Sequence, residues 1–284
     1  MEEIKADVTG RFGQAAAATQ PLTSHPDGGC AAGERLAHRD SPSVELVDLT
    51  RSIRNRMPHS GTQPVPMIWP SSTHAESASA RGGGFSTGSM AMLLSDHSGT
   101  HVDAWNHLDP GPDAADIAAM PLTDFVIPAA GAIDVSGLGP DEIIPVSVLL
   151  AAFDALAEQV EAVIIRTGAV PEPPPTSEIY LKGFPGLDAA GVHALADRGA
   201  RLIGVDTRSL DTAASESGDD YLPAHRACLR RRVVALENLV IPAELCGQVF
   251  ELLVLPLKIL TGTGSPVRAV ARLPLRPTPL SSRK

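Results

Sequence analysis

The 284-residue chain has few cysteines and no long hydrophobic run. Its three cysteines, Cys30, Cys228 and Cys246, form an odd and sparse set that excludes a disulfide framework and suits a reducing compartment. The longest apolar region, residues 239–260, is interrupted by prolines and charged residues, so we expect no transmembrane helix. Residues 1–10 lack the basic start and apolar core of a signal peptide. We therefore expect a cytoplasmic protein without a membrane partner.

Positive charge is also scarce in this chain. Lysine and arginine total 23 against 33 aspartates and glutamates, which gives a formal net charge of −10. Because an acidic protein repels the phosphate backbone, we expect no nucleic-acid partner. The sequence contains no Walker loop, and Gly82–Gly84 lack the strand and helix that flank a phosphate-binding glycine loop. A small molecule remains as the expected substrate.

The hydrophobic content of 43% is sufficient for a folded core. Apolar residues spaced three and four apart predict helices over Val146–Gln159 and Ala189–Arg198. Short aliphatic and β-branched runs predict strands at Val44–Asp48, Met90–Leu94, Phe125–Ile127, Ala132–Val135, Val163–Ile165, Leu202–Val205, Val233–Leu236 and Val267–Ala271. Strands and helices do not alternate regularly, so we expect a single mixed α/β domain over residues 43–272. Residues 1–42 and 273–284 are interpreted as tails.

One segment, residues 95–107, concentrates side chains that bind metals. Its spacing, His97-x3-His101-x-Asp103-x3-His107, is expected by chance in roughly one such chain in a thousand. Imidazole and carboxylate are the usual ligands of Zn²⁺, Mn²⁺ and related ions. Gly99 permits a tight turn, after which an extended chain places His101 and Asp103 on one face. His107 is then free to be a further ligand or a proton carrier, and the alternative is a polar surface loop.

Two later segments contain further candidates. Glu237 lies within an apolar run, where a carboxylate is costly unless it is paired or bound to metal. A ligand and a buried ion pair are both open for Glu237, and His225 alone is a weaker candidate. Residues 204–211 follow a predicted strand, and their polar side chains are expected to support the site rather than to act directly.

At these residues the sequence resembles the metal-dependent cyclase and kynurenine formamidase-like hydrolase family, which also includes isatin hydrolase. The family signature H-x-G-T-H-x-D-x-P-x-H corresponds to residues 97–107. The other landmarks follow in the family's order, and the likeness spans residues 44–272. These landmarks are Asp48-Leu49-Thr50, Arg166-Thr167-Gly168, Gly204–Asp211, Glu237-Asn238-Leu239 and Gly264–Arg268.

The resemblance implies a swivelling β/β/α domain, with a mixed, partly barrel-like sheet flanked by helices, that assembles as a homodimer or homotetramer. It also implies two divalent metal ions per chain, zinc or manganese. In the implied site, His97 and His101 bind one ion, His225 binds the other, and Asp103 and Glu237 are shared between them. The resemblance gives His107 the role of general acid and base.

Two departures from the family pattern concern the substrate pocket. Trp105 stands where the signature has proline, which changes a pocket wall and not a ligand. Kynurenine formamidases carry a tryptophan about a dozen residues after the opening aspartate, where this chain has Met57–Ser60 and reaches its first tryptophan only at Trp69. We expect Trp69 and Trp105 to contribute to substrate binding.

The sequence thus predicts a metal-dependent hydrolase that cleaves a C–N amide bond in a formamide or cyclic amide. An alternative is a cyclase, dehydratase or lactone hydrolase of secondary metabolism that uses the same metal site as a Lewis acid. A second alternative is a non-catalytic metal-binding protein, which the presence of His107 disfavours because such a protein needs no acid or base.

Overall fold

A computed structural model describes residues 35–37, 44–59, 63–80, 85–109, 111, 113–171, 181, 183–217 and 220–274. Most of the predicted N-terminal tail, nearly all of the predicted C-terminal tail and Gly82–Gly84 lie outside the described residues. Within the predicted N-terminal tail, Arg35–Ala37 form a short strand, β1, that pairs with Val44–Asp48, β2. None of the helices in the described part of the chain is long and apolar enough to cross a membrane.

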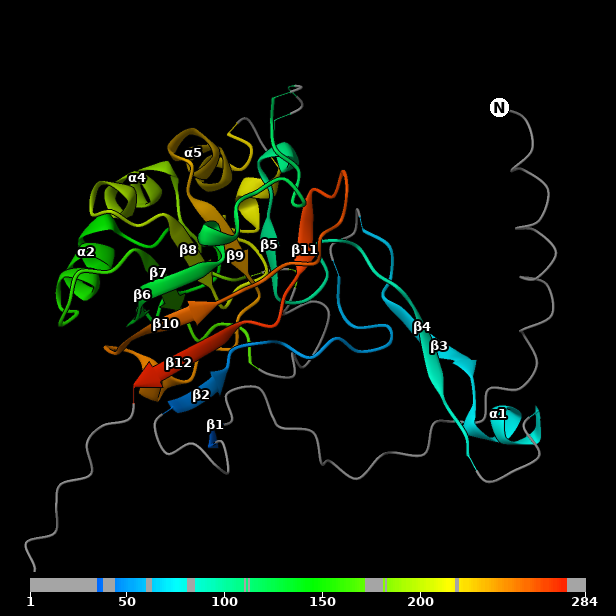
Figure 1. Cartoon of the computed structure of the whole chain (residues 1–284). Coiled ribbons are helices and arrows are strands. Elements are labelled where there is room, and N and C mark those ends of the chain that lie inside the picture. Colours follow the sequence, from blue (N-terminus) through cyan, green and yellow to red (C-terminus); the bar gives the residue numbers. More distant parts are fainter. Residues whose placement is uncertain are drawn as a thin grey trace, which may run out of the picture. The chain divides into compact units, whose positions relative to one another are not determined.

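The main sheet has ten strands in the order β1-β2-β12-β10-β6-β7-β8-β9-β5-β11 (Figure 1). Strands β6 to β9 are parallel to one another, and the pairings on either side of them are antiparallel. The strands beyond β2 are β5 His101–Asp103, β6 Val126–Asp134, β7 Ala162–Arg166, β8 Leu202–Val205, β9 Val234–Glu237, β10 Val249–Leu253, β11 Gly264–Pro266 and β12 Val270–Pro274. The sheet is mixed and curls into a half-barrel, which confirms the predicted fold class.

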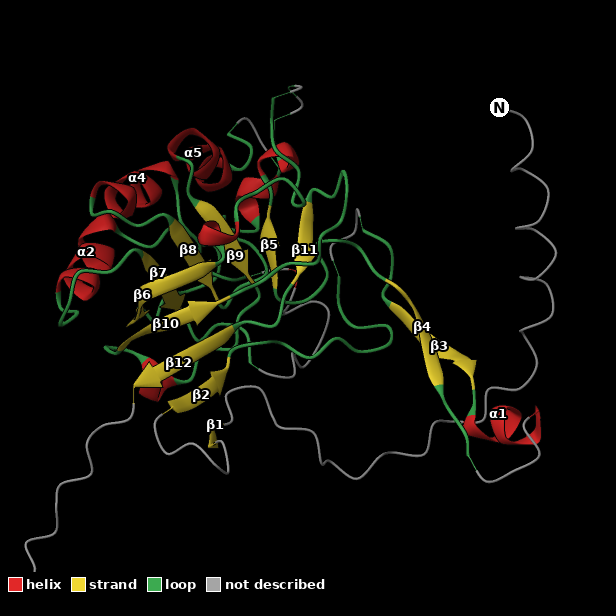
Figure 2. Cartoon of the chain, viewed as in Figure 1, coloured by secondary structure: helices red, strands yellow, loops and turns green. Residues whose placement is uncertain are grey.

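Three helices cover one face of the parallel strands, as Figure 2 shows. They are α2 Val146–Asp154, α4 Ala189–Asp197 and α5 Pro223–Arg231. The sheet has an apolar layer on each side, and strand β7 is an example. Its successive apolar side chains point to opposite faces of the sheet. Val163 and Ile165 pack in the cluster that contains the helices, while Ile164 between them packs in the cluster on the other face. The parallel strands are therefore buried on both faces.

A separate two-stranded sheet is formed by β3, Met67–Ser72, and β4, Ser89–Leu93. The short helix α1, His74–Ala80, follows β3 in the connection between them. This β3–β4 hairpin exposes large apolar side chains on both strands, unlike the strands of the main sheet. The most exposed of them are Met67, Trp69, Met90, Met92 and Leu93.

Several predicted boundaries differ from the observed ones. The predicted strands 125–127 and 132–135 are one continuous strand, β6, which pairs with β10 and β7. The sequence suggested two strands because a proline and a glycine lie in the middle of β6. The predicted strand 267–271 overlaps only the start of β12, which begins at Val270. The helix predicted over 146–159 ends at Asp154. Helix α5 was not predicted, because its apolar positions are separated by several arginines.

Candidate metal centre

Strand pairing assembles the first part of the site. β5 is antiparallel to β9 in a register that sets His101 directly opposite Glu237. On the other side β5 pairs with β11, where Asp103 lies opposite Gly264. A side chain at Gly264 would meet the His97 ring at 2.8 Å, so glycine is required there. Gly99 has φ of +67°, the left-handed conformation that the predicted turn before β5 needs.

Helix α5 brings His225 to the same place through a buried aspartate. The Asp211 carboxylate accepts hydrogen bonds from the backbone N–H of Ala224 at 2.7 Å and of His225 at 3.1 Å. These N–H groups belong to the first helical turn, which has no internal partner for them. The same carboxylate accepts a third hydrogen bond, of 2.5 Å, from Nδ1 of His225. Asp211 therefore fixes both the start of α5 and the orientation of the imidazole.

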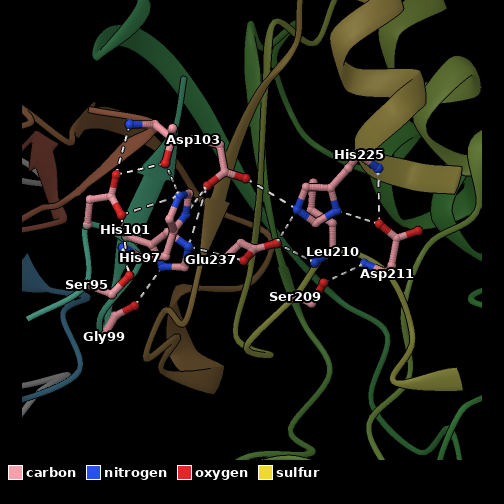
Figure 3. Close-up of polar contacts among 12 residues, drawn as sticks. Ser95, His97, Gly99, His101, Asp103, Ser209, Leu210, Asp211, His225 and Glu237 are labelled. Atoms are coloured by element: carbon pink, nitrogen blue, oxygen red, sulfur yellow. Dashed lines mark hydrogen bonds and ion pairs between the residues drawn. The ribbon is translucent and has the colours of Figure 1, made fainter. Parts of the chain in front are cut away.

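Five side chains converge on one small volume (Figure 3). Asp103 Oδ1 lies 2.9 Å from His97 Nδ1 and 3.6 Å from His101 Nε2. Asp103 Oδ2 lies 3.3 Å from His225 Nε2. Glu237 reaches His101 Nε2 at 3.3 Å with one oxygen and His225 Nε2 at 3.1 Å with the other. The structure thus brings together all five residues predicted as metal ligands, with the two carboxylates between the imidazoles.

Hydrogen bonds on the outer side of each ring fix which nitrogen faces inward. His101 Nδ1 lies 2.9 Å from the carbonyl oxygen of Gly99, which can only accept, so Nδ1 carries the proton. His225 Nδ1 donates to Asp211 in the same way. When either ring is in its neutral form, Nε2 therefore presents a lone pair to Asp103 and Glu237.

His97 is oriented by a relay through Thr263. The Thr263 hydroxyl donates to Asp96 at 2.8 Å and therefore accepts from His97 Nε2, 2.9 Å away. Burial alone raises the pKa of Asp96, but the hydrogen bonds from Thr263 lower it below 3.8, so Asp96 is an ionised acceptor. The lone pair of the neutral His97 ring is consequently on Nδ1, which faces Asp103.

Three imidazole lone pairs thus point at two carboxylates, an arrangement that requires protons or a cation between them. Both oxygens of Asp103 are buried and accept no hydrogen bond within the described structure, although histidine nitrogens lie close to them. Donor atoms within 4.8 Å of one another form two groups that share Asp103. One group contains His97 and His107, and the other contains His225 and Glu237. These donors fit divalent ions of the zinc or manganese type.

The pKa values of the donor groups indicate that a bound cation must displace protons from histidine side chains. Burial disfavours charge on His225, but Glu237, Asp103 and Asp211 together raise its pKa well above 6.5. Burial raises the pKa of Glu237, but the charge of His225 together with the hydrogen bonds from His101 and His225 lowers it to about 2. Protons on His101 and His225, whose pKa values are both raised, are therefore favoured when no cation is bound. A divalent ion must expel them, so its affinity is expected to rise with pH.

His107 differs from the other three histidines. It ends the 3-10 turn η1, Trp105–His107, and its ring centroid lies 4.2 Å from that of His97 and 6.0 Å from that of His225. No hydrogen bond fixes its ring among the described residues. Burial lowers its pKa below 6.5, and the neighbouring histidines add to this against the opposing charge of Asp103. A neutral, unrestrained imidazole beside the donor cluster is suited to take up a proton.

Two cavities adjoin the cluster. One, of about 200 Å³, is lined by four of the histidines together with Arg208, Glu216 and Tyr221. The other is smaller and more apolar, and Trp105 lines it beside Asp103 and His107. The Arg232 guanidinium lies 5.5 Å over the Trp105 ring. Trp69 lines neither cavity and pairs instead with Ala91 in the β3–β4 hairpin.

Two residues of the segment 204–211, which was expected to support the site, contact predicted ligands. The backbone N–H of Leu210 donates a 2.7 Å hydrogen bond to Glu237, and Asp211 orients His225. Sequence reasoning did not identify Thr263, whose contact with His97 spans 166 positions and leaves no local signal. Arg208 was missed for a different reason, since arginine is not a metal ligand and only the cavity shows its position.

Replacing Asp211 by Asn is expected to weaken divalent metal binding by about 10- to 100-fold, the usual effect of removing the acceptor behind a ligating histidine. The single oxygen of asparagine can still accept from the N–H of Ala224, which keeps one of the two hydrogen bonds at the start of α5. Titration of zinc or manganese against a competing chelator measures the change. Asp188→Asn is the control, because Asp188 caps α4 through a 2.8 Å hydrogen bond from Gly191 outside the site. Equal affinity in Asp211→Asn and the wild type would contradict this role.

Comparison with known proteins identifies the family to which the chain is similar. The model of the putative cyclase family matches residues 47–212. The kynurenine formamidase of Salinibacter ruber is 33% identical over 231 residues, which cover 81% of this chain and 98% of that protein. The kynurenine formamidase of Delftia acidovorans is 37% identical over 186 residues, covering 64% of this chain and 78% of that protein.

A solved structure shares the fold. An isatin hydrolase bound to the product analogue thioisatinate has a TM-score of 0.71 at 24% identity, over 82% of this chain and 93% of that chain. At this identity the likeness shows the fold alone. The suspected family resemblance is confirmed by the family model and the relatives.

Proposed function

The chain belongs to the putative cyclase family, and on that premise we propose that it is a metal-dependent hydrolase of a small formamide or cyclic amide. One observation carries the proposal. Three oriented imidazole lone pairs and two buried carboxylates surround a common volume, and a fourth, unrestrained histidine lies beside it. The curated relatives are kynurenine formamidases, which supports a formamide as the first substrate to test.

We assign the ligands as the family resemblance implies. In this assignment His97 and His101 would hold one divalent ion, zinc or manganese, and His225 would hold a second. Asp103 and Glu237 are shared, which their positions between the imidazoles support. Divalent ions bound there supply Lewis-acid chemistry that polarises the amide carbonyl and lowers the pKa of water toward neutrality.

The protein's own contribution to the reaction is proton transfer and orientation. Neutral His107 accepts a proton from the attacking water and then donates it to the leaving nitrogen as the C–N bond breaks. Asp211 and Thr263 hold His225 and His97 still, so the ligands need no reorganisation. Trp105 lines the smaller, more apolar cavity beside Asp103 and His107. We expect the uncharged part of a substrate to rest against its ring.

Hydrolysis of formanilide in ¹⁸O-labelled water tests the proposal. Metal-loaded enzyme is expected to release aniline and formate, with one labelled oxygen per formate. The alternative, a cyclase or dehydratase, uses an oxygen or carbon nucleophile of the substrate and leaves the product unlabelled. A lactone hydrolase also incorporates label, so lactones are assayed separately and the broken bond is read from the product. Hydrolysis of lactones alone would contradict the amidase proposal.

We propose that the chain forms a homodimer or homotetramer through the β3–β4 hairpin. A two-stranded hairpin is marginally stable alone in water. Here Met92 is 64% exposed, and its neighbours Met90, Leu93 and Trp69 are also exposed. A second copy of the chain would cover these side chains, and the predicted substrate role of Trp69 would then depend on the assembly.

Replacing Met92 by Glu is expected to reduce the molar mass in solution to that of one 29.6 kDa chain, whereas the wild type gives a multiple of it. A buried charge without a partner opposes association strongly enough to shift the equilibrium. Light scattering after size-exclusion chromatography measures the mass. Leu122→Glu is the matched control, since Leu122 is 69% exposed in a 3-10 turn outside the hairpin. A wild-type mass of 29.6 kDa would contradict the assembly.

A further inference from the structure

The cavity beside the donor cluster contains a guanidinium group that the proposed hydrolysis does not use. Arg208 follows β8 and lines this cavity together with His97, His101 and His107. It lies in the same turn as Leu210, whose N–H holds Glu237. We infer that Arg208 binds a carboxylate carried by the substrate, which makes the substrate an anionic formamide or amide. The inference rests on the proposed function and adds the substrate's charge to it.

The surroundings of Arg208 hold the guanidinium at the cavity wall. Only 11% of its side chain is exposed, and its guanidinium carbon lies 5.2 Å over the ring of Phe184. Nη2 donates to the Leu181 carbonyl at 3.4 Å and to the Glu216 carboxylate. Both contacts use the same nitrogen, and Nε has no hydrogen-bond partner. The donor capacity of this fixed group is therefore incompletely used.

The guanidinium group of Arg208 is suited to bind an anion. An arginine presents a planar fork of donors that matches a carboxylate in two-point contact. Its acidic partner, Glu216, lines the same cavity and is 27% exposed, so the pair is not sealed inside the core. Divalent ions held by the donor cluster would add positive charge to the same cavity. A substrate carboxylate can therefore share the guanidinium with Glu216 or replace it.

A purely structural ion pair explains these features less well. A buried pair contributes little stability when its donors are not all satisfied. Arg201, at the opposite end of β8, shows the structural type for comparison. It bonds to Glu161 at 2.8 Å and to the Thr123 carbonyl, and it lines no part of this cavity. The two arginines thus flank one strand, and only Arg208 faces the donor cluster.

The reaction itself balances without another reactant. One water adds to the formamide, the C–N bond breaks, and formate and the amine leave, while the carboxylate bound to Arg208 is unchanged. Formanilide and its ortho, meta and para carboxylate derivatives are suitable probes, because the distance from Arg208 to the scissile carbonyl selects among them. The measured quantity is kcat/KM for each acid divided by kcat/KM for formanilide.

Wild-type enzyme is expected to prefer at least one carboxylate isomer over formanilide. Arg208→Gln is expected to lower that preference ratio by about 10- to 100-fold, mainly through KM, because a charge-assisted hydrogen bond is lost. Arg208→Lys keeps the charge without the fork and should retain part of the ratio. Arg201→Gln is the matched control and should leave the ratio unchanged. Metal content is measured in every variant to verify an intact site.

The outcomes separate the subsite from the proposed function. Hydrolysis of formanilide with no preference for any acid would overturn the carboxylate subsite and leave the hydrolase standing. An equal loss in Arg208→Gln on neutral and acidic substrates would also overturn it, since that result indicates a structural role. Absence of hydrolysis of all four compounds by metal-loaded enzyme would overturn the proposed function and the subsite with it.

Discussion

Replacing Asp103 by Asn is expected to abolish metal binding and hydrolysis together. Asp103 belongs to both donor groups and lies within 3.6 Å of the inward nitrogens of His97, His101 and His225. Asparagine has nearly the same shape but one neutral oxygen, so it cannot neutralise two ions at once. The loss should exceed the 10- to 100-fold typical of residues behind the ligands. Mass spectrometry of dialysed protein is expected to find close to two ions per wild-type chain and almost none in Asp103→Asn.

The control for this experiment must separate metal loss from unfolding. Asparagine has the shape of aspartate, and Glu237 remains in contact with the imidazoles of His101 and His225. Circular dichroism should therefore show a folded variant. Asp188→Asn should keep its metal and its activity. Two ions in Asp103→Asn after reconstitution with zinc or manganese would show that Asp103 is not the shared ligand.

The sequence predicted the part of this site that is local. His97, His101 and Asp103 lie within seven positions, and Gly99 marks the turn that orients them. Glu237 was recognisable as a carboxylate inside an apolar strand, but its chemistry stayed open. Pairing of β5 with β9 settles its position, because the register sets it opposite His101. Such registers depend on tertiary contacts that no short segment encodes.

The contacts that the groups behind the ligands make could not be predicted for the same reason. Asp211 acts on a histidine 14 positions away through a helix whose arginines conceal its apolar face. Thr263 reaches His97 only because β11 closes the edge of the sheet next to β5. Similarly, the β6 strand contains Pro128 and Gly131, residues that usually end a strand, and only its neighbours reveal it as continuous.

Replacing His107 by Ala is expected to lower kcat by about 10²- to 10⁴-fold while two ions per chain remain bound. The imidazole must be neutral to accept a proton, and burial lowers its pKa below 6.5. In the wild type, kcat/KM should therefore decline as pH falls through a midpoint below 6.5 and be flat above it. In His107→Ala that decline should disappear or move to the pH at which metal is lost. Rates from pH 5 to 8, with metal content at each pH, measure both effects.

The competing role for His107 is that of a ligand, since it lies in one donor group with His97 and Asp103. The two roles give opposite results, because loss of a ligand removes an ion whereas loss of a proton carrier does not. Added imidazole should restore part of the activity of His107→Ala only if a proton carrier is missing. His193→Ala, a partly buried histidine of α4 outside the site, should change neither rate nor metal content. Loss of one ion in His107→Ala, without rescue, would make His107 a ligand and leave the proton transfer to another group.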